Sequence, residues 1–258
     1  MEVVICIKPV KSNIIMNDSY QRDNLVINPY DLYALKDTLK HKVDVGARIT
    51  CISMAGENAQ DVLIRCIAMG ADEAVLLCDP AFGGADTVAT TYTIATAIEK
   101  LSESSLIVCG GQSIDGETGQ IPFGIAQRLS IPCIANVRSI INLSEDEVVL
   151  ESATDEIITI IRVRLPIVIA YQDFISTNDT VSLMSIKKAK RKGVMHVDSE
   201  QLGADKNRCG IKGSKTKVMS ICEGKQELRN KGVTFINGTS SDKARFIHVL
   251  LKKNLGEH

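Results

Sequence analysis

Short apolar runs alternate with segments of helical periodicity over the first 130 residues of the chain. Four short, mostly apolar runs predict strands, at 3–7, 49–54, 74–78 and 106–109; the first is continuously apolar, which is typical of a strand that is buried on both faces. The segments between and after them predict four helices: one that begins at Pro29 after an N-cap Asn28, then 59–69, 86–101 and 118–129. This alternation predicts an α/β fold with a doubly wound, mostly parallel, Rossmann-like sheet.

The pattern changes after residue 140. Three strand-like runs follow one another without helices between them, at 148–150, 157–163 and 167–171, and they predict antiparallel strands added to the sheet. A basic segment follows at 183–192, and the last amphipathic helix is expected over 241–253. Because the region 185–240 is too polar to form a core, we expect an α/β domain over 1–182. Residues 183–258 would form a C-terminal arm that needs a partner surface.

Composition narrows the class of protein. The chain has 258 residues, of which 45% are hydrophobic and 24% are charged, and its formal net charge is −1, which is typical of a globular protein rather than a nucleic-acid-binding one. No apolar run reaches the roughly 18 residues that a membrane span needs, and the N-terminus does not resemble a signal peptide. Eight cysteines without C-x-x-C spacing predict buried, reduced thiols in a cytoplasmic protein.

The candidate chemistry lies where the parallel strands end. Ligands bind open parallel sheets beyond the carboxyl ends of the strands. Gly110 and Gly111 end one strand and open a polar loop with hydroxyls at Ser113 and Thr118. Glycines allow a ligand close to the backbone, and the helix that follows offers its N-terminus to a phosphate, although an ordinary glycine-rich turn has the same composition. Phosphate-loop, metalloprotease and serine-hydrolase motifs are absent, so the sequence favours nucleotide binding, without catalytic residues or a metal site of its own.

Six segments in order resemble the β subunit of electron transfer flavoproteins: CIKPV at 6–10, INPYDLYAL at 27–35, AMGAD at 68–72, AFGGADTVAT at 81–90, CGGQSIDGETGQ at 109–120 and KKAKRK at 187–192. The resemblance covers residues 1–135 well and 183–193 moderately. It implies a heterodimer with an α subunit that holds most of an FAD, and a second adenine nucleotide, FAD or AMP, on the β chain. Together the two subunits would shuttle electrons between a flavin-containing dehydrogenase, acyl-CoA dehydrogenase-like or other, and an acceptor, or bifurcate them.

The resemblance also implies site residues. Those expected to contact the nucleotide are Cys6, Asn28, Pro29, Tyr30, Asp31, Met54, Gly110, Gly111, Gln112, Ser113, Asp115, Gly116, Glu117 and Thr118. Family members with a second FAD also use the turn that matches Asp86, Thr87 and Thr90, and its presence here favours FAD over AMP. The alternative for Asn28, Asp31 and Asp86 is helix capping alone.

Partner docking is expected at the basic segment. Leu183 matches the leucine with which the family anchors itself on a dehydrogenase, and Lys188 and Lys190 lie in the basic stretch beside it. The alternative is a solvated helix face, which is the usual role of a charge run.

The chain differs from the family pattern after residue 140. Residues 148–150 lack an arginine, Glu156 and Ile157 replace glycines, and 178–180 lack a proline and an arginine. Two other functions remain open on this fold. The first is a nucleotide-binding regulatory sensor without a redox role, which would not need Leu183 and the basic arm. The second is an ATP-dependent ligase, which would need a phosphate loop after the first strand.

Overall fold

The computed structural model describes residues 1–11, 24–101, 105–154, 156–174, 180–219 and 238–255. The chain divides into two compact units, Met1–Lys217 and Val218–His258. The second unit contains α9 (Ser240–Leu255), which confirms the last predicted helix. Among the described residues, no helix is long and apolar enough to cross a membrane.

The first unit is built on a nine-stranded sheet with the order β11-β5-β4-β1-β6-β10-β7-β8-β9. Strands β11 to β7 in this order are parallel to their neighbours, and β8 and β9 are antiparallel additions. The strands are β1 (Glu2–Cys6), β4 (Arg48–Met54), β5 (Glu73–Leu77), β6 (Leu106–Gly110), β7 (Cys133–Leu143), β8 (Glu147–Ala153), β9 (Ile158–Arg164), β10 (Ile167–Tyr171) and β11 (Met195–Val197). A separate antiparallel pair consists of β2 (Pro9–Lys11) and β3 (Leu25–Ile27).

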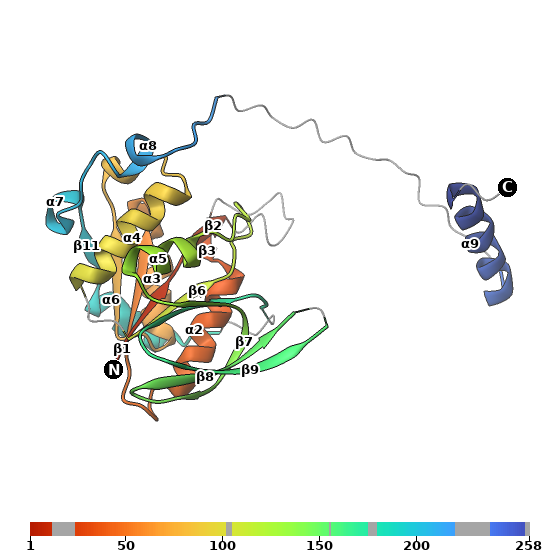
Figure 1. The fold of residues 1–258 in the computed structure, drawn as a ribbon, viewed down its shortest axis with the longest axis horizontal. Coiled ribbons are helices and arrows are strands. Elements are labelled where there is room, and N and C mark those ends of the chain that lie inside the picture. The colour runs from red at the N-terminus through yellow and green to blue at the C-terminus, as the bar shows by residue number, and fades with distance from the viewer. Residues whose placement is uncertain (12–23, 102–104, 155, 175–179, 220–237, 256–258) are drawn as a thin grey trace. The chain divides into compact units, whose positions relative to one another are not determined.

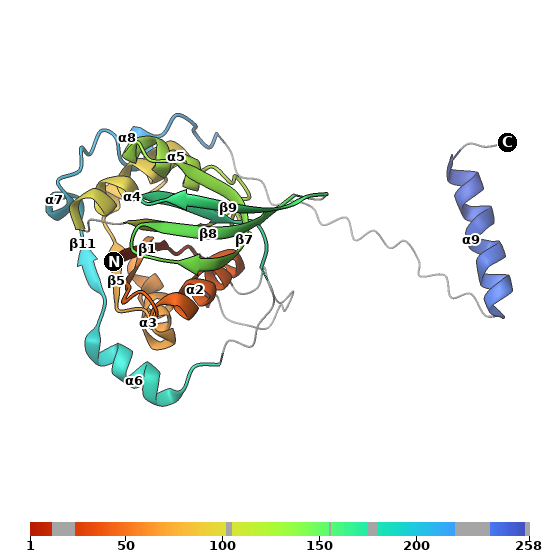
Figure 2. The ribbon, with the colours of Figure 1, turned by 60° about the horizontal axis from the view of Figure 1, so that its bottom comes forward.

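Helices cover both faces of the sheet (Figures 1 and 2). They are α2 (Pro29–His41), α3 (Gln60–Met69), α4 (Thr87–Leu101), α5 (Ile121–Leu129), α6 (Leu183–Lys192), α7 (Ser199–Leu202) and α8 (Gly210–Gly213), with short 3-10 turns η1 (Glu57–Ala59) and η2 (Pro80–Phe82). Along β1, Val3 and Ile5 belong to the core under α2 and α3, whereas Val4 and Cys6 belong to the core under α4 and α5. Burial on both faces explains the continuously apolar strands and confirms the doubly wound α/β fold.

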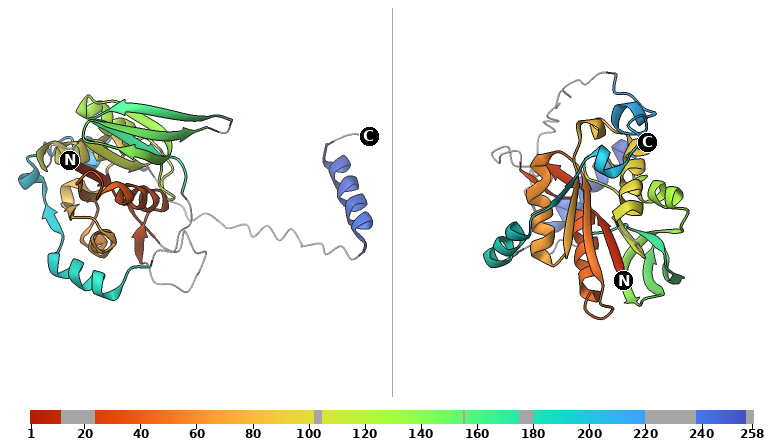
Figure 3. Two further views of the ribbon diagram at one scale, coloured as in Figure 1. Left: turned by 90° about the horizontal axis from the view of Figure 1, so that it is seen from below. Right: turned by 90° about the vertical axis from the view of Figure 1, so that its left-hand side faces the viewer.

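Two expectations about the strands are corrected. The run 167–171 is not an antiparallel addition: β10 lies inside the sheet, parallel to both β6 and β7, and all five of its residues are buried. The strand β7 was not predicted, because it mixes apolar residues with polar ones such as Asn136 and Arg138 and most of it is only partly buried. The predicted antiparallel strands β8 and β9 are confirmed, and Figure 3 shows them at the end of the body opposite α6.

The segment after α6 packs on its own chain. β11 extends the sheet by pairing with β5, and Val197, Leu202 and Cys209 enter the core under α4. We expected the whole arm from residue 183 to need a partner surface, yet the first compact unit reaches Lys217. Of the sequence departures, 148–150 lie in the first half of β8, whereas Asn178 and Asp179 lie outside the described residues.

Candidate functional site at the carboxyl edge of the sheet

Three segments meet beyond the carboxyl ends of β1 and β6. They are the link after β1 that contains Lys8, the first turn of α2 at residues 28–31, and the loop 110–120 that follows β6. Two buried polar side chains of the α2 segment, Asn28 and Asp31, connect the other two segments. This is the edge at which the strand alternation predicted a ligand site.

Asn28 holds the loop 110–120 in place. Its side chain is 1% exposed, and its Nδ2 donates to the Gln112 carbonyl at 2.9 Å while its Oδ1 accepts from the Ile114 N–H at 3.3 Å. Its backbone N–H donates to the Lys8 carbonyl at 3.0 Å. The side chain makes no capping bond to α2. Helix capping therefore does not explain this asparagine, whose polar atoms serve the loop.

Asp31 joins the link after β1 to the loop after β6. Its Oδ2 accepts from the Lys8 N–H at 2.7 Å and its Oδ1 accepts from the Gly110 N–H at 3.1 Å. The residue is 5% exposed. Burial raises the pKa of Asp31 to about 7, although the hydrogen bonds from Lys8, Asn28 and Gly110 act in the opposite direction. A carboxyl group with this pKa exchanges its proton near neutral pH.

Gly110 and Gly111 are required by the packing of the chain itself. A Cβ on Gly110 would overlap the Asp31 carboxylate and would lie 2.7 Å from the Cβ of Tyr30. A Cβ on Gly111 would lie 2.7 Å from the carbonyl oxygen of Tyr171 at the end of β10. We expected these glycines to admit a ligand, and the structure shows that they admit α2 and β10 to the backbone of the loop.

The rim of this site is polar and accessible. Lys8 Nζ donates to Asp115 Oδ1 at 2.6 Å and to Ser113 Oγ at 3.1 Å. Burial raises the pKa of Asp115, but the hydrogen bonds from Lys8 and Ser113 and the charge of Lys8 outweigh it, so the pKa is lowered overall. Tyr30, the hydroxyl of which accepts from Gln112 Nε2 at 2.8 Å, closes one side. The rim thus presents an ammonium group, hydroxyls and backbone groups to solvent.

The remaining residues expected to contact the nucleotide lie in the second half of this loop and at the start of α2. Gly116, Glu117 and Thr118 are exposed, and Glu117 has a positive φ of 49°. Helix α5 therefore begins at Ile121, three residues later than predicted. Pro29 is the first residue of α2, as its position after Asn28 predicted.

Small and sulfur-containing side chains lie at the carboxyl ends of β1, β4 and β6, next to the candidate site. Cys6 and Cys109 are buried at the ends of β1 and β6, and Met54 ends β4 in a partly buried position. The hydroxyl of Ser53, next to Met54, is buried without a hydrogen-bond partner among the described residues. Sequence reasoning did not single out Ser53 or Lys8. The signal for Ser53 was a polar residue at the carboxyl end of an apolar run.

The Asp86 carboxylate makes its hydrogen bonds to α4 and to the segment 215–216, and not to the Asn28 and Asp31 cluster. Its Oδ1 accepts from the N–H groups of Val88 and Ala89 and so caps α4. Its Oδ2 accepts from the Lys215 N–H at 2.6 Å and from the Thr216 N–H and hydroxyl at 3.0 and 3.2 Å. Burial raises the pKa of Asp86, but these hydrogen bonds lower it overall to about 2. No described hydrogen bond joins Asp86, Thr87 or Thr90 to the Asn28 and Asp31 cluster.

The expected docking residues lie on another element. Leu183 is the first residue of α6 and is 82% exposed, and Lys188 and Lys190 are exposed on the same helix. Ser182 caps the helix by accepting from the Ser185 N–H at 3.0 Å, and the buried Ala189 anchors α6 against the body. The structure therefore separates the docking candidates from the nucleotide candidates.

The donor and acceptor groups at the carboxyl edge fit the phosphates and the ribose of a nucleotide. Phosphates need cationic and N–H or O–H donors, which Lys8, Ser113 and the backbone of the loop supply. Ribose hydroxyls need acceptors and donors of the kind that Asp115 and Thr118 carry. The unpartnered Ser53 hydroxyl is one further polar group at this edge.

Comparison with known proteins gives the family. The model of the electron transfer flavoprotein domain matches residues 19–202. The electron transfer flavoprotein subunit beta of Clostridium acetobutylicum is 34% identical over 239 residues, which cover 90% of this chain and 91% of that protein. Protein FixA of Azorhizobium caulinodans is 32% identical over 86% of this chain and 84% of its own length. The caffeyl-CoA reductase-Etf complex subunit CarD of Acetobacterium woodii is 34% identical over 75% of this chain and 74% of its own length. The chain therefore belongs to the electron transfer flavoprotein β subunit family.

Proposed function

We propose that this chain is the β subunit of a heterodimeric electron transfer flavoprotein that binds one adenine nucleotide at the carboxyl edge of its sheet. The observation that carries the proposal is the pair of buried side chains, Asn28 and Asp31, that holds the loop 110–120 to α2. Family membership supports a redox role with an α subunit as partner. In this role the dimer passes electrons between a flavin-containing dehydrogenase and an acceptor, in the cytoplasm.

Each group at the edge has a part in binding. Lys8 neutralises phosphate charge, and the loop 110–120 supplies N–H and hydroxyl donors at fixed positions. Asn28 and Asp31 do not need to touch the nucleotide, because they position the loop that does. A flavin bound by the dimer supplies the redox chemistry, and this chain orients the nucleotide that it holds.

The second nucleotide is FAD or AMP, and Asp86 bears on the choice. An FAD that used the Asp86 carboxylate would have to replace its contacts with Lys215 and Thr216. AMP needs no such replacement. Acid release of the nucleotides from the purified αβ dimer, followed by chromatography, decides between them. Two flavins per dimer would identify FAD, and one flavin with one AMP would identify AMP.

The site itself is tested with Asn28→Ala in the co-expressed αβ dimer. We expect the variant to lose most of the β-chain nucleotide, since the loop 110–120 loses the two hydrogen bonds that the Asn28 side chain makes to it. Asn207→Ala, in an exposed position before α8, is the matched control and should retain the nucleotide. A full nucleotide content in Asn28→Ala would place the site elsewhere. A chain that binds a nucleotide but neither an α subunit nor a flavin would instead be a sensor.

A further inference from the structure

One buried hydroxyl group at the carboxyl edge, that of Ser53, has no hydrogen-bond partner in the part of the chain that the structure describes. Ser53 belongs to β4 and is 1% exposed. Its neighbours across the sheet are apolar, since Leu76 is its partner on β5 and Ile7 continues β1 on its other side. A buried hydroxyl without a hydrogen bond lowers the stability of a fold, and such groups are rare in native structures. Packing alone therefore does not account for a serine at this position.

The Ser53 side chain faces the same side of the sheet as α2. Side chains of successive strand residues alternate between the two faces, and Cys51, two residues earlier, belongs to the core under α2 and α3. Asn28 and Asp31, which hold the loop 110–120, lie at the start of α2 on this face. The hydroxyl therefore lies on the side of the sheet at which the nucleotide site is proposed.

Ser53 is also the last buried residue of β4. Met54 and Ala55 are partly exposed, and Gly56 is exposed. Ala55 is the next residue on the face of Ser53 and packs against the same core. Because Ala55 carries only a methyl group, β4 itself places no large side chain between the Ser53 hydroxyl and the edge of the sheet.

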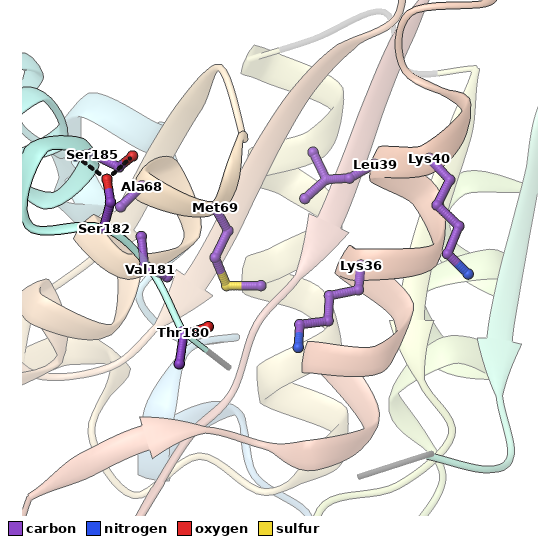
Figure 4. Close-up of a pocket in the computed structure, with 9 residues that line it drawn as sticks. All are labelled: Lys36, Leu39, Lys40, Ala68, Met69, Thr180, Val181, Ser182 and Ser185. Carbon is purple, nitrogen blue, oxygen red and sulfur yellow. Dashed lines mark hydrogen bonds between the residues drawn. The ribbon is translucent and has the colours of Figure 1, made fainter. Parts of the chain in front are cut away.

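The hollow between α2, α3 and α6 does not lead to Ser53. It measures about 450 Å³, and Figure 4 shows Met69, the last residue of α3, pointing from α3 toward α2 at this hollow. Ser53 precedes the start of α3, so the hollow lies at the other end of this helix. Its described lining contains no residue of β4 or of the loop 110–120. A group that reaches the Ser53 hydroxyl therefore comes from the carboxyl edge.

Ser53 lies two strands away from the loop 110–120. β1 separates β4 from β6, and the carboxyl end of β6 opens the loop. Adjacent strands are about 4.8 Å apart, so the ends of β4 and β6 are separated by about 10 Å. This is close to the distance from the phosphate to the far edge of the base in an extended nucleoside 5′-phosphate. A nucleotide with its phosphate at Lys8 and the loop therefore brings its base to the end of β4.

We propose that Ser53 binds the base of the nucleotide, by a hydrogen bond between its Oγ and a ring nitrogen or the amino group of the adenine. The inference rests on the proposed function, since it adds a contact to the base at the same site. A serine hydroxyl can both donate and accept, so it can pair with either kind of group. The base supplies the hydrogen bond that Ser53 lacks in the chain, and Ser53 makes binding depend on the base as well as on the phosphate.

AMP and ribose 5-phosphate test this contact together, because they share the phosphate and the ribose and differ in the base. AMP is the probe, since FAD contains the same adenosine 5′-phosphate. The β-chain nucleotide is removed from the αβ dimer by dialysis, binding of labelled AMP is measured by equilibrium dialysis, and binding of ribose 5-phosphate is measured by competition. We expect Ser53→Ala to weaken AMP binding about five- to tenfold, as the loss of one hydrogen bond predicts, and to change ribose 5-phosphate binding less than twofold.

Two further measurements distinguish a contact to the base from a structural role. Thr50→Val, in the same strand but with its side chain on the opposite face, is the matched control and should change AMP binding less than twofold. The melting temperature of the Ser53→Ala dimer without added nucleotide should equal or exceed that of the wild type, because the variant removes an unpaired buried hydroxyl. A lower melting temperature would mean that the hydroxyl stabilises the chain itself, and would overturn the inference.

The remaining outcomes separate this inference from the proposed function. AMP binding at the wild-type level in Ser53→Ala would overturn the inference and leave the proposed site intact. Equal weakening of AMP and ribose 5-phosphate binding would also overturn it, since the hydroxyl would then act on the phosphate or ribose end of the nucleotide. A wild-type dimer that does not bind AMP would overturn both the inference and the proposed function.

Discussion

Asp31→Asn removes a buried carboxyl group that the fold holds in an unusual protonation state. Burial raises the pKa of Asp31 from 3.8 to about 7. Between these two pH values the folded chain keeps a proton that the unfolded chain has lost. The free energy of unfolding therefore decreases as pH rises from about 4 to about 7, and the contribution of Asp31 is constant outside this window.

The magnitude follows from the same shift. A rise from 3.8 to about 7 corresponds to at most about 4 kcal/mol of stability lost across the window. Asparagine does not titrate, so the variant lacks this pH dependence. It also has one acceptor oxygen where Asp31 has two, which accept from Lys8 and Gly110. Losing one of these hydrogen bonds costs about 1 kcal/mol at every pH.

Urea unfolding of the full-length chain, followed by circular dichroism at four pH values from 5 to 8, measures the effect. We expect the wild type to lose stability relative to Asp31→Asn as pH rises, so that the variant equals or exceeds the wild type at pH 8. Asp86→Asn is the control, since the pKa of Asp86 is lowered to about 2 and its titration is complete below this range. A constant difference between wild type and Asp31→Asn from pH 5 to 8 would mean that Asp31 is ionised throughout, and would refute the reasoning.

Three further variants test contacts of the first unit. Gly111→Val should reduce the nucleotide content of the αβ dimer, because its Cβ would lie 2.7 Å from the Tyr171 carbonyl, and acid release with chromatography measures this. Asp86→Ala should cost about 1 kcal/mol from the lost cap of α4 and free the Thr216 segment, which thermal melting and limited proteolysis would detect. Asp37→Ala should cost about 3 kcal/mol in urea unfolding, because it leaves the buried Tyr171 hydroxyl and a β7 N–H unpaired. Wild-type values in any of these measurements would contradict the corresponding contact.

The parallel strands could be predicted because the burial of both of their faces is reflected in their own apolar residues. β1 and β6 are apolar at successive positions since both of their faces are covered. β10 is equally apolar, but its place between β6 and β7 depends on pairing with residues far away in the chain. The local pattern therefore predicted a strand at 167–171, but it did not predict that this strand runs parallel to its neighbours.

The candidate site could be predicted only in part, for a similar reason. Asparagine before a helical proline is the usual sign of an N-cap, and the residue type is the same whether its side chain caps the helix or binds a loop 84 positions away. Asp86 shows the opposite case, since it does cap α4, and its second oxygen binds Lys215 and Thr216, which no local pattern indicates. Lys8 lies in the segment 6–10 that carries the resemblance, but its role at the rim was not predicted, because its partner Asp115 becomes its neighbour only through the fold.

Helix α2 joins the candidate site to the core of the sheet. Its first turn holds Asp31 and follows Asn28, so it carries the loop 110–120. Further along the helix, Asp37 ties α2 to β7 and to Tyr171 of β10. A 13-residue helix is about 20 Å long, so the contacts of Asp37 fix the helix to the sheet within its own length. The position of the loop 110–120 therefore depends on contacts of α2 with strands that lie away from the loop, and a substitution at Asp37 is expected to disturb the loop as well as the core.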